Sequence, residues 1–475
     1  MRIRWFGIFL VVVAGFLALP AARAQASLPS PLERPDNAGL KNHLKHLIFI
    51  IQENRSFDNY FGTFPGADGF PSPLPCLPSK WHPSQCVTPW PDHAASNQGG
   101  PYDAPYQTAD IDGGKMDGFE IEAEEDLQNK FHCPPSARQG ELSHRRFMAT
   151  DDEVGPYVAK CTLDVMGYHD GTDLPNYWTY AATYALQDHF FESTFSSSHP
   201  AHLELFSLWS AKCTQLDPPD VNSCAANTDP GNIWSPTLPT PYLWTDITYL
   251  MNQYGVTWKA YLDGGLGDLN GHNAVQTLWD VLPGFETVQE DGQVGNAENY
   301  TDVDFMSDAA AGTFPQVSWV LPKFPDSEHP TASIAHGETY VTNLINAVMS
   351  GPAWNETAIF VAYDDCAGFY DHVPPPYTFD SLGLGVRVPA FIVSPWVKPG
   401  LIDSQICSTD CYAKLIEDDF MNGARLSSAG RPDPRVVYRD EEPKYGNLVK
   451  DFDFKHKPLP PVLLRAHPLS RLRDD

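Results

Sequence analysis

Residues 46–62, HLIFIIQENRSFDNYFG, constrain the fold most strongly, because an apolar run ends there in an abrupt polar cluster. The run from Leu47 to Ile51 is β-branched and aromatic, which is typical of a buried strand. Glu53 and Asn54 follow it, and their side-chain oxygens are hard donors of the kind that divalent cations prefer. Ligands of α/β proteins bind where the carboxyl ends of the strands open. The stretch therefore predicts either half of a metal site or a strand followed by a polar turn.

Apolar segments recur along the chain with both strand and helix patterns. Strands are expected at 256–261, 317–321, 357–363 and 388–393, and helices at 174–191, 336–350 and 411–420. Alternating strands and helices indicate one α/β domain with a mainly parallel sheet. We expect this single domain to span residues 25–475, with a long Pro- and Gly-rich insertion at 63–110 and an extended tail from 430 onward.

The N-terminal 24 residues have the pattern of a secretory signal peptide. Arg2 and Arg4 precede an apolar run over residues 5–19, and Ala22 and Ala24 supply small side chains at the expected cleavage position. The run is shorter than the ~20 residues that a membrane span needs. No later stretch is long and apolar enough to serve as an anchor. The sequence thus predicts a secreted or periplasmic protein.

Charge and cysteine content fit that location. The formal net charge is -29, which argues against nucleic-acid binding driven by bulk charge. Nine cysteines in an exported chain suggest disulfides. The local pairs expected first are Cys76–Cys86, Cys213–Cys224 and Cys407–Cys411. Cys366 is the odd one out, either a free buried thiol or a disulfide partner.

Three further polar clusters follow predicted elements: Ser196–His199, Asp326–His329 and Asp364-Asp365. If they converge with Glu53 and Asn54, the site holds carboxylates, an amide, a hydroxyl and a histidine. This set suits metal-assisted displacement at phosphorus, with the serine as nucleophile and the histidine protonating the leaving oxygen. Taken singly, the aspartates could form a turn or helix cap, and the serines a loop.

These segments resemble the bacterial phosphoesterase family of non-haemolytic phospholipases C and acid phosphatases, within the alkaline-phosphatase-like superfamily. The resemblance rests on residues 46–62 and on GGKMDGF (113–119), MGYHDGTDLPNYW (166–178), SSSHPAH (196–202), DSEHP (326–330), YDDCAGFYDHVPPP (363–376) and VPAFIVSPW (388–396). It implies a three-layer α/β/α sandwich around a mainly parallel sheet.

The resemblance also implies roles for individual residues. The metal ligands are Glu53, Asn54, Ser198, Asp364 and Asp365, for a divalent ion that could be Ca, Mg, Mn or Zn. Ser198 is the nucleophile, with Ser197 as the alternative, and His329 is the general acid or a phosphate contact. Asn54, His202 and His372 are assigned to substrate binding, and His372 alternatively to a supporting role.

Two departures from the family pattern affect the expected activity. Cys366 and Ala367 stand where a glycine pair is usual, and the upstream histidine is missing, with His93 the nearest replacement. The leading expectation is a metal-dependent phosphoesterase acting on monoesters, because little chain follows the last predicted helix. The alternatives are a phospholipase C that cleaves phospholipid diesters and a non-catalytic binding protein of the same fold.

Overall fold

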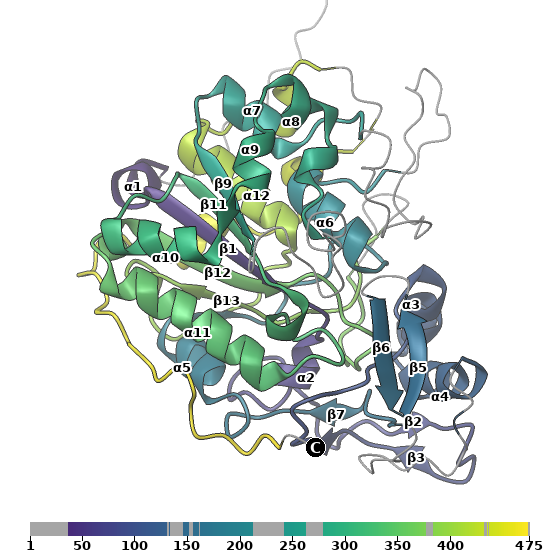
Figure 1. The fold of residues 1–475 in the computed structure, drawn as a ribbon. Helices are drawn as coiled ribbons and strands as arrows, with labels where there is room; N and C mark the ends of the chain where they lie inside the picture. Colours follow the sequence, from purple (N-terminus) through teal and green to yellow (C-terminus); the bar gives the residue numbers. More distant parts are fainter. Residues whose placement is uncertain are drawn as a thin grey trace, which may run out of the picture. The chain divides into compact units, whose positions relative to one another are not determined.

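Strand β1 (His46–Gln52) lies in the middle of an eight-stranded sheet with the order β10-β9-β11-β1-β12-β13-β8-β14 (Figure 1). The computed structural model describes residues 37–130, 133, 146–151, 155–160, 162–211, 242–262, 279–376, 383–431, 435 and 437–473. The other strands of this sheet are β8 (Ala185–Gln187), β9 (Trp258–Leu262), β10 (Tyr300–Thr301), β11 (Val317–Leu321), β12 (Thr357–Tyr363), β13 (Ala390–Val393) and β14 (Leu401–Asp403). Strand β1 is parallel to both of its neighbours, and only β13 runs antiparallel to the strands beside it. The predicted α/β class with a mainly parallel sheet is confirmed.

The central strands are apolar along their whole length because both faces of the sheet are covered. Every residue of β12 is buried, as is β1 from Leu47 onward. Phe49 stacks on Phe360 of β12 at 5.0 Å between ring centroids and meets Tyr412 at 4.9 Å on one face of the sheet. Such continuous apolar runs are typical of parallel strands inside α/β proteins.

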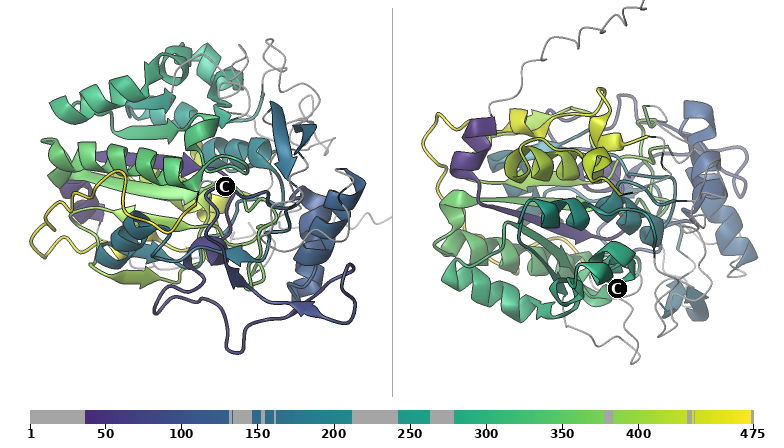
Figure 2. Two further views of the ribbon diagram at one scale, coloured as in Figure 1. Left: turned by 60° about the horizontal axis from the view of Figure 1, so that its bottom comes forward. Right: turned by 90° about the horizontal axis from the view of Figure 1, so that it is seen from above.

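Helices cover the sheet on both sides. On one face lie α1 (Asn37–His43), α6 (Ser198–Ser207) and α12 (Thr409–Phe420), and α12 contacts both of the others. On the other lie α5 (Pro175–Thr183), α10 (Asp302–Ala311) and α11 (Ile334–Ser350). Figure 2 shows α1 and α12 separated from α10 and α11 by the sheet. This arrangement is an α/β sandwich.

Shorter elements form the insertions and the approaches to the sheet. They are α2 (Phe57–Phe61), β2 (Leu77–Pro78), β3 (Cys86–Val87), β4 (Trp90–Pro91), α3 (Ala104–Ile111), α4 (Phe119–Asn129), β5 (Arg146–Asp151), β6 (Gly155–Lys160), β7 (Gly167–Tyr168), α7 (Ile247–Gln253), α8 (Glu286–Glu290) and α9 (Val294–Glu298). Strands β2 and β3 pair inside the predicted insertion, and β5 and β6 form a separate hairpin. Residues 36–475 cluster into one compact unit.

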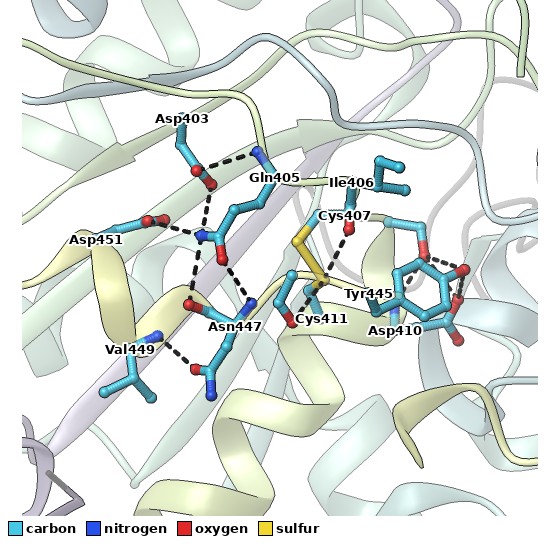
Figure 3. Close-up of a disulfide and its surroundings, with 12 residues drawn as sticks. Asp403, Gln405, Ile406, Cys407, Asp410, Cys411, Tyr445, Asn447, Val449 and Asp451 are labelled. Carbon is cyan, nitrogen blue, oxygen red and sulfur yellow. Dashed lines mark hydrogen bonds between the residues drawn. A yellow bond between two sulfur atoms is a disulfide. The ribbon is translucent and has the colours of Figure 1, made fainter. Parts of the chain in front are cut away.

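Two of the three expected disulfides lie within the described residues, and both are present. Cys76 is bonded to Cys86, and Cys407 to Cys411. The second bond closes the turn that leads into α12, next to the buried contact between the Tyr445 hydroxyl and Asp410 Oδ2 at 2.9 Å (Figure 3). Cys366 is buried and free, which is one of its two expected states. The pair Cys213–Cys224 and the signal segment 1–24 lie outside the described residues.

Within the described part of the chain, no helix is both long enough and apolar enough to cross a membrane.

Candidate active site

The register of β1 and β12 brings two acidic segments together. Gln52 pairs with Tyr363 at the ends of the strands, and the Asp364 N–H donates to the Gln52 carbonyl at 3.1 Å. Asn54, in the next turn, has a φ of 64°. Its backbone N–H donates to Asp364 Oδ1 at 2.9 Å, and its side-chain amide donates to Asp365 Oδ1. A single strand ladder thus places both acidic segments at one edge of the sheet.

Helix α6 supplies the hydroxyl and a histidine. Ser198 is its first residue, and the Ser198 hydroxyl donates to Glu53 Oε2 at 3.1 Å and lies 3.2 Å from Asp365 Oδ2. His202 is four residues further on and therefore shares the same helix face. His202 Nε2 lies 3.0 Å from Glu53 Oε1 and 3.8 Å from Asp364 Oδ2. All these side chains are buried.

The pKa values of Glu53 and His202 indicate that a cation would be favourable in this cluster. Burial, and then the charge of Asp364, raise the pKa of Glu53 well above its usual value. Burial also lowers the pKa of His202 to about 4, against the opposing effect of Asp364, so its imidazole is neutral at neutral pH. A neutral imidazole nitrogen can bind a metal, and a bound cation would offset the burial and the neighbouring negative charge that raise the pKa of Glu53.

Buried oxygen atoms without hydrogen-bond partners are a second indication of a cation site. Among the described residues, Asp364 Oδ2 and Asn54 Oδ1 are buried without a hydrogen-bond partner. One ligand atom each from Glu53, His202 and Asp364 lies within 4.8 Å of the other two. Buried polar atoms without partners are costly, and a bound cation would satisfy them. The donor set therefore fits a divalent metal ion.

The structure gathers most of the predicted site residues into this one cluster: Glu53, Asn54, Ser198, His202, Asp364 and Asp365. His329 approaches it through its backbone segment, since the Glu53 N–H donates to the Ser327 carbonyl at 2.9 Å. The His329 ring packs against Phe324 at 5.5 Å, and its Nδ1 contacts the Pro330 carbonyl. The general-acid role of His329 stays a prediction.

His372 belongs to a second buried cluster. His372 Nδ1 lies 2.7 Å from Asp58 Oδ2, and Arg387 bridges Asp58 at 3.1 Å and Asp371 at 2.9 Å. Although burial opposes it, the hydrogen bond to Asp58 raises the pKa of His372. Asp58, Asp371 and His372 have metal-compatible spacing. The Arg387 guanidinium already forms ion pairs with both carboxylates, however, so this arrangement favours the supporting role for His372.

Sequence reasoning missed α6 and the position of His202 beside Glu53 and Asp364. The serine run and Pro200 obscure the helix, because neither gives an apolar period. The signal that remained was the spacing of Ser198 and His202, which is one helical turn. Arg387 was also missed, since a lone arginine before a strand has no distinguishing pattern.

Comparison with known proteins agrees with the chemistry of this cluster. A sequence model of the Phosphoesterase family matches residues 44–421. The chain is 27% identical to a protein named phospholipase C A from Mycobacterium tuberculosis, over 90% of this chain and 80% of that protein. It is 28% identical to phospholipase C B of the same organism, over 95% and 86%.

A more distant similarity connects the chain to longer proteins. It is 25% identical to a non-hemolytic phospholipase C from Burkholderia pseudomallei, over 87% of this chain and 58% of that protein. The family match covers β1, α6 and β12, the three elements that build the cluster. The chain therefore belongs to the Phosphoesterase family, and it is a hydrolase of phosphoric ester bonds.

Proposed function

We propose that the chain is a metal-dependent phosphoesterase in which Ser198 is the nucleophile. The observation that carries the proposal is the position of the Ser198 hydroxyl, 3.1 Å from Glu53 Oε2 and 3.2 Å from Asp365 Oδ2. Ser198 also begins α6, and the amino terminus of a helix favours the negative charge of a phosphate.

The reaction proceeds in two displacements at phosphorus. The Ser198 oxygen attacks, the bond between phosphorus and the leaving alkoxide breaks, and a phosphate ester of the serine forms. Water then hydrolyses that ester and restores the hydroxyl, releasing the phosphorylated headgroup from a diester or phosphate from a monoester. The carboxylates of Glu53 and Asp365 are within reach of the hydroxyl proton. A divalent cation, when bound, lowers the pKa of a neighbouring hydroxyl and offsets the charge of the phosphate oxygens.

The ligands that we propose for the cation are Glu53, Asn54, Ser198, Asp364 and Asp365, as expected from the sequence, together with His202. Its neutral Nε2 faces two of these carboxylates. An imidazole donor favours zinc or another transition metal over Ca²⁺ or Mg²⁺, which prefer oxygen alone. His202 thereby moves from the predicted substrate-binding role to the metal.

For the substrate class we propose phosphodiesters of phospholipid headgroups, because the relatives of similar length are named phospholipases C. This differs from the monoester preference expected from the sequence, which is the competing class. We further propose that residues 1–24 direct export and that 25–475 function as one domain. The disulfides Cys76–Cys86 and Cys407–Cys411 suit an oxidising compartment.

Both the nucleophile and the substrate class are tested by measuring hydrolysis of p-nitrophenyl phosphate and of p-nitrophenylphosphorylcholine. The proteins compared are the wild type, Ser198→Ala and Ser197→Ala. We expect the diester to be the better substrate, Ser198→Ala to be inactive on both, and Ser197→Ala to turn over both. Unchanged turnover in Ser198→Ala contradicts the nucleophile, and a preference for the monoester contradicts the substrate class.

A further inference from the structure

Glu328, in the segment after β11, is a fully buried carboxylate with four side-chain donors. Glu328 Oε1 accepts from the Tyr177 hydroxyl at 2.5 Å and from Gln52 Nε2 at 3.1 Å. Glu328 Oε2 accepts from the hydroxyls of Tyr60 at 2.5 Å and Tyr363 at 2.7 Å. Four donors occupy the hydrogen-bonding capacity of a carboxylate.

Two of these donors stand next to residues of the candidate site. Gln52 is the last residue of β1 and directly precedes Glu53, and Tyr363 is the last residue of β12 and directly precedes Asp364. The strand ladder fixes the backbone only as far as this pair. The Glu328 side chain therefore joins the ends of both strands at the point where the ladder stops.

The backbone of the same segment makes further connections to the site. The Ser327 carbonyl accepts from the Glu53 N–H at 2.9 Å, and the Glu328 carbonyl accepts from Arg55 Nε at 3.1 Å and Nη2 at 2.7 Å. Glu328 has a φ of 70°, a conformation that costs energy in a non-glycine residue. A Cβ atom on Gly337 would collide with the Glu328 side chain, so α11 leaves room for this arrangement.

We infer that Glu328 is a positioning residue that sets the distance between the Glu53–Asn54 and Asp364–Asp365 ends through Gln52 and Tyr363. The inference rests on the proposed metal-dependent function. The four side-chain partners of Glu328 are Tyr60, Tyr177, Gln52 and Tyr363, none of which is a proposed metal ligand. Glu328 acts through two neighbours that each hold a metal-facing residue, in the way that outer hydrogen bonds orient metal ligands.

Titration of the metal-free protein with Mn²⁺, and in parallel with Zn²⁺, by calorimetry tests the inference. The variants are Glu328→Gln and Tyr363→Phe, and the matched control is Tyr261→Phe. Tyr261 is buried in β9 of the same sheet, and its hydroxyl also donates to a carboxylate, Asp308 Oδ2, at 2.7 Å. Strand β11 separates β9 from β1 in the sheet. Tyr363→Phe keeps the carboxylate and three of its donors, so it serves even if Glu328→Gln does not fold.

We expect Glu328→Gln and Tyr363→Phe to weaken metal affinity roughly 10- to 100-fold and to lower kcat more than they raise KM. Tyr261→Phe should lower the melting temperature to a similar extent as Tyr363→Phe and keep the wild-type metal affinity. Equal metal affinities in Tyr363→Phe and Tyr261→Phe would overturn the inference. A wild type that binds neither metal and hydrolyses no ester would instead overturn the proposed function.

Discussion

Asn54 holds two acidic side chains in place through its backbone N–H and its side-chain amide. Its φ of 64° turns the chain directly after β1, so that its backbone N–H reaches Asp364 and its amide reaches Asp365. Asparagine tolerates this left-handed conformation better than other residues with a Cβ atom. The position therefore serves both the turn and the acidic pair.

Comparison of Asn54→Gly with Asn54→Ala separates these two contributions. Both variants lose the amide, and both should lose most hydrolytic activity. Only Asn54→Ala places a strained backbone at a positive φ, so it should be about 1–2 kcal/mol less stable than Asn54→Gly in chemical denaturation. Equal stability of the two variants would show that the turn is not constrained as the structure has it.

Glu338 gives a prediction for the pH dependence of stability. Burial raises the pKa of Glu338 to about 8, against the hydrogen bond from the Asn176 N–H at 2.8 Å. From about pH 5 to pH 8 the folded protein thus binds more protons here than the unfolded chain, and stability falls as pH rises. The melting temperature of Glu338→Gln minus that of the wild type should therefore increase as the pH rises from about 5 to about 8. A constant difference between the two proteins would contradict the assignment.

At the scale of elements, α6 is held near both ends by arginines from the C-terminal segment. Arg439 donates to the Ser193 carbonyl before the helix and lies 3.6 Å from Glu204 within it and 3.7 Å from Asp410. Arg435 donates to the Ser207 carbonyl at the end of α6. Both arginines lie beyond the family match, which ends at residue 421.

Arg439→Met should therefore destabilise the fold by about 3–5 kcal/mol, because it leaves buried carboxylates without a counter-charge. Arg431→Met is the matched control. Arg431 pairs with Glu286 and Glu290, whose side chains are 37% and 54% exposed, so its loss should cost less than about 1 kcal/mol. Chemical denaturation measures both, and similar losses in the two variants would contradict this account of α6.

Some of these elements could be predicted from the sequence, and others could not. The strands β1, β11 and β12 were predicted because burial on both faces leaves an unbroken apolar run. Helix α6 was not, since nearly all of it is buried and it has no polar face to create a period. The acidic residues that follow β1 and β12 could therefore be predicted from the sequence. The position of His202 and the contacts of Glu328 could not, because they arise only from tertiary packing.

For the whole molecule, the net charge of -29 affects how the protein would approach the proposed lipid substrate. A strongly acidic protein is repelled by anionic bilayers, and salt screens this repulsion. Hydrolysis of phosphatidylcholine vesicles should therefore slow when anionic lipid is mixed in and recover when salt is added. Turnover of p-nitrophenylphosphorylcholine, as the soluble control, should change little with salt. Faster hydrolysis on anionic vesicles would contradict this expectation.

Mass spectrometry of enzyme quenched during turnover tests whether Ser198, in the cluster of Glu53, His202 and Asp364, is the residue that attacks phosphorus. With p-nitrophenylphosphorylcholine as the substrate, we expect one added phosphorylcholine group on the peptide that contains Ser198. The modification should persist in Ser197→Ala and be absent from Ser198→Ala. A phosphorylcholine group on another residue, or full turnover by Ser198→Ala, would contradict the account.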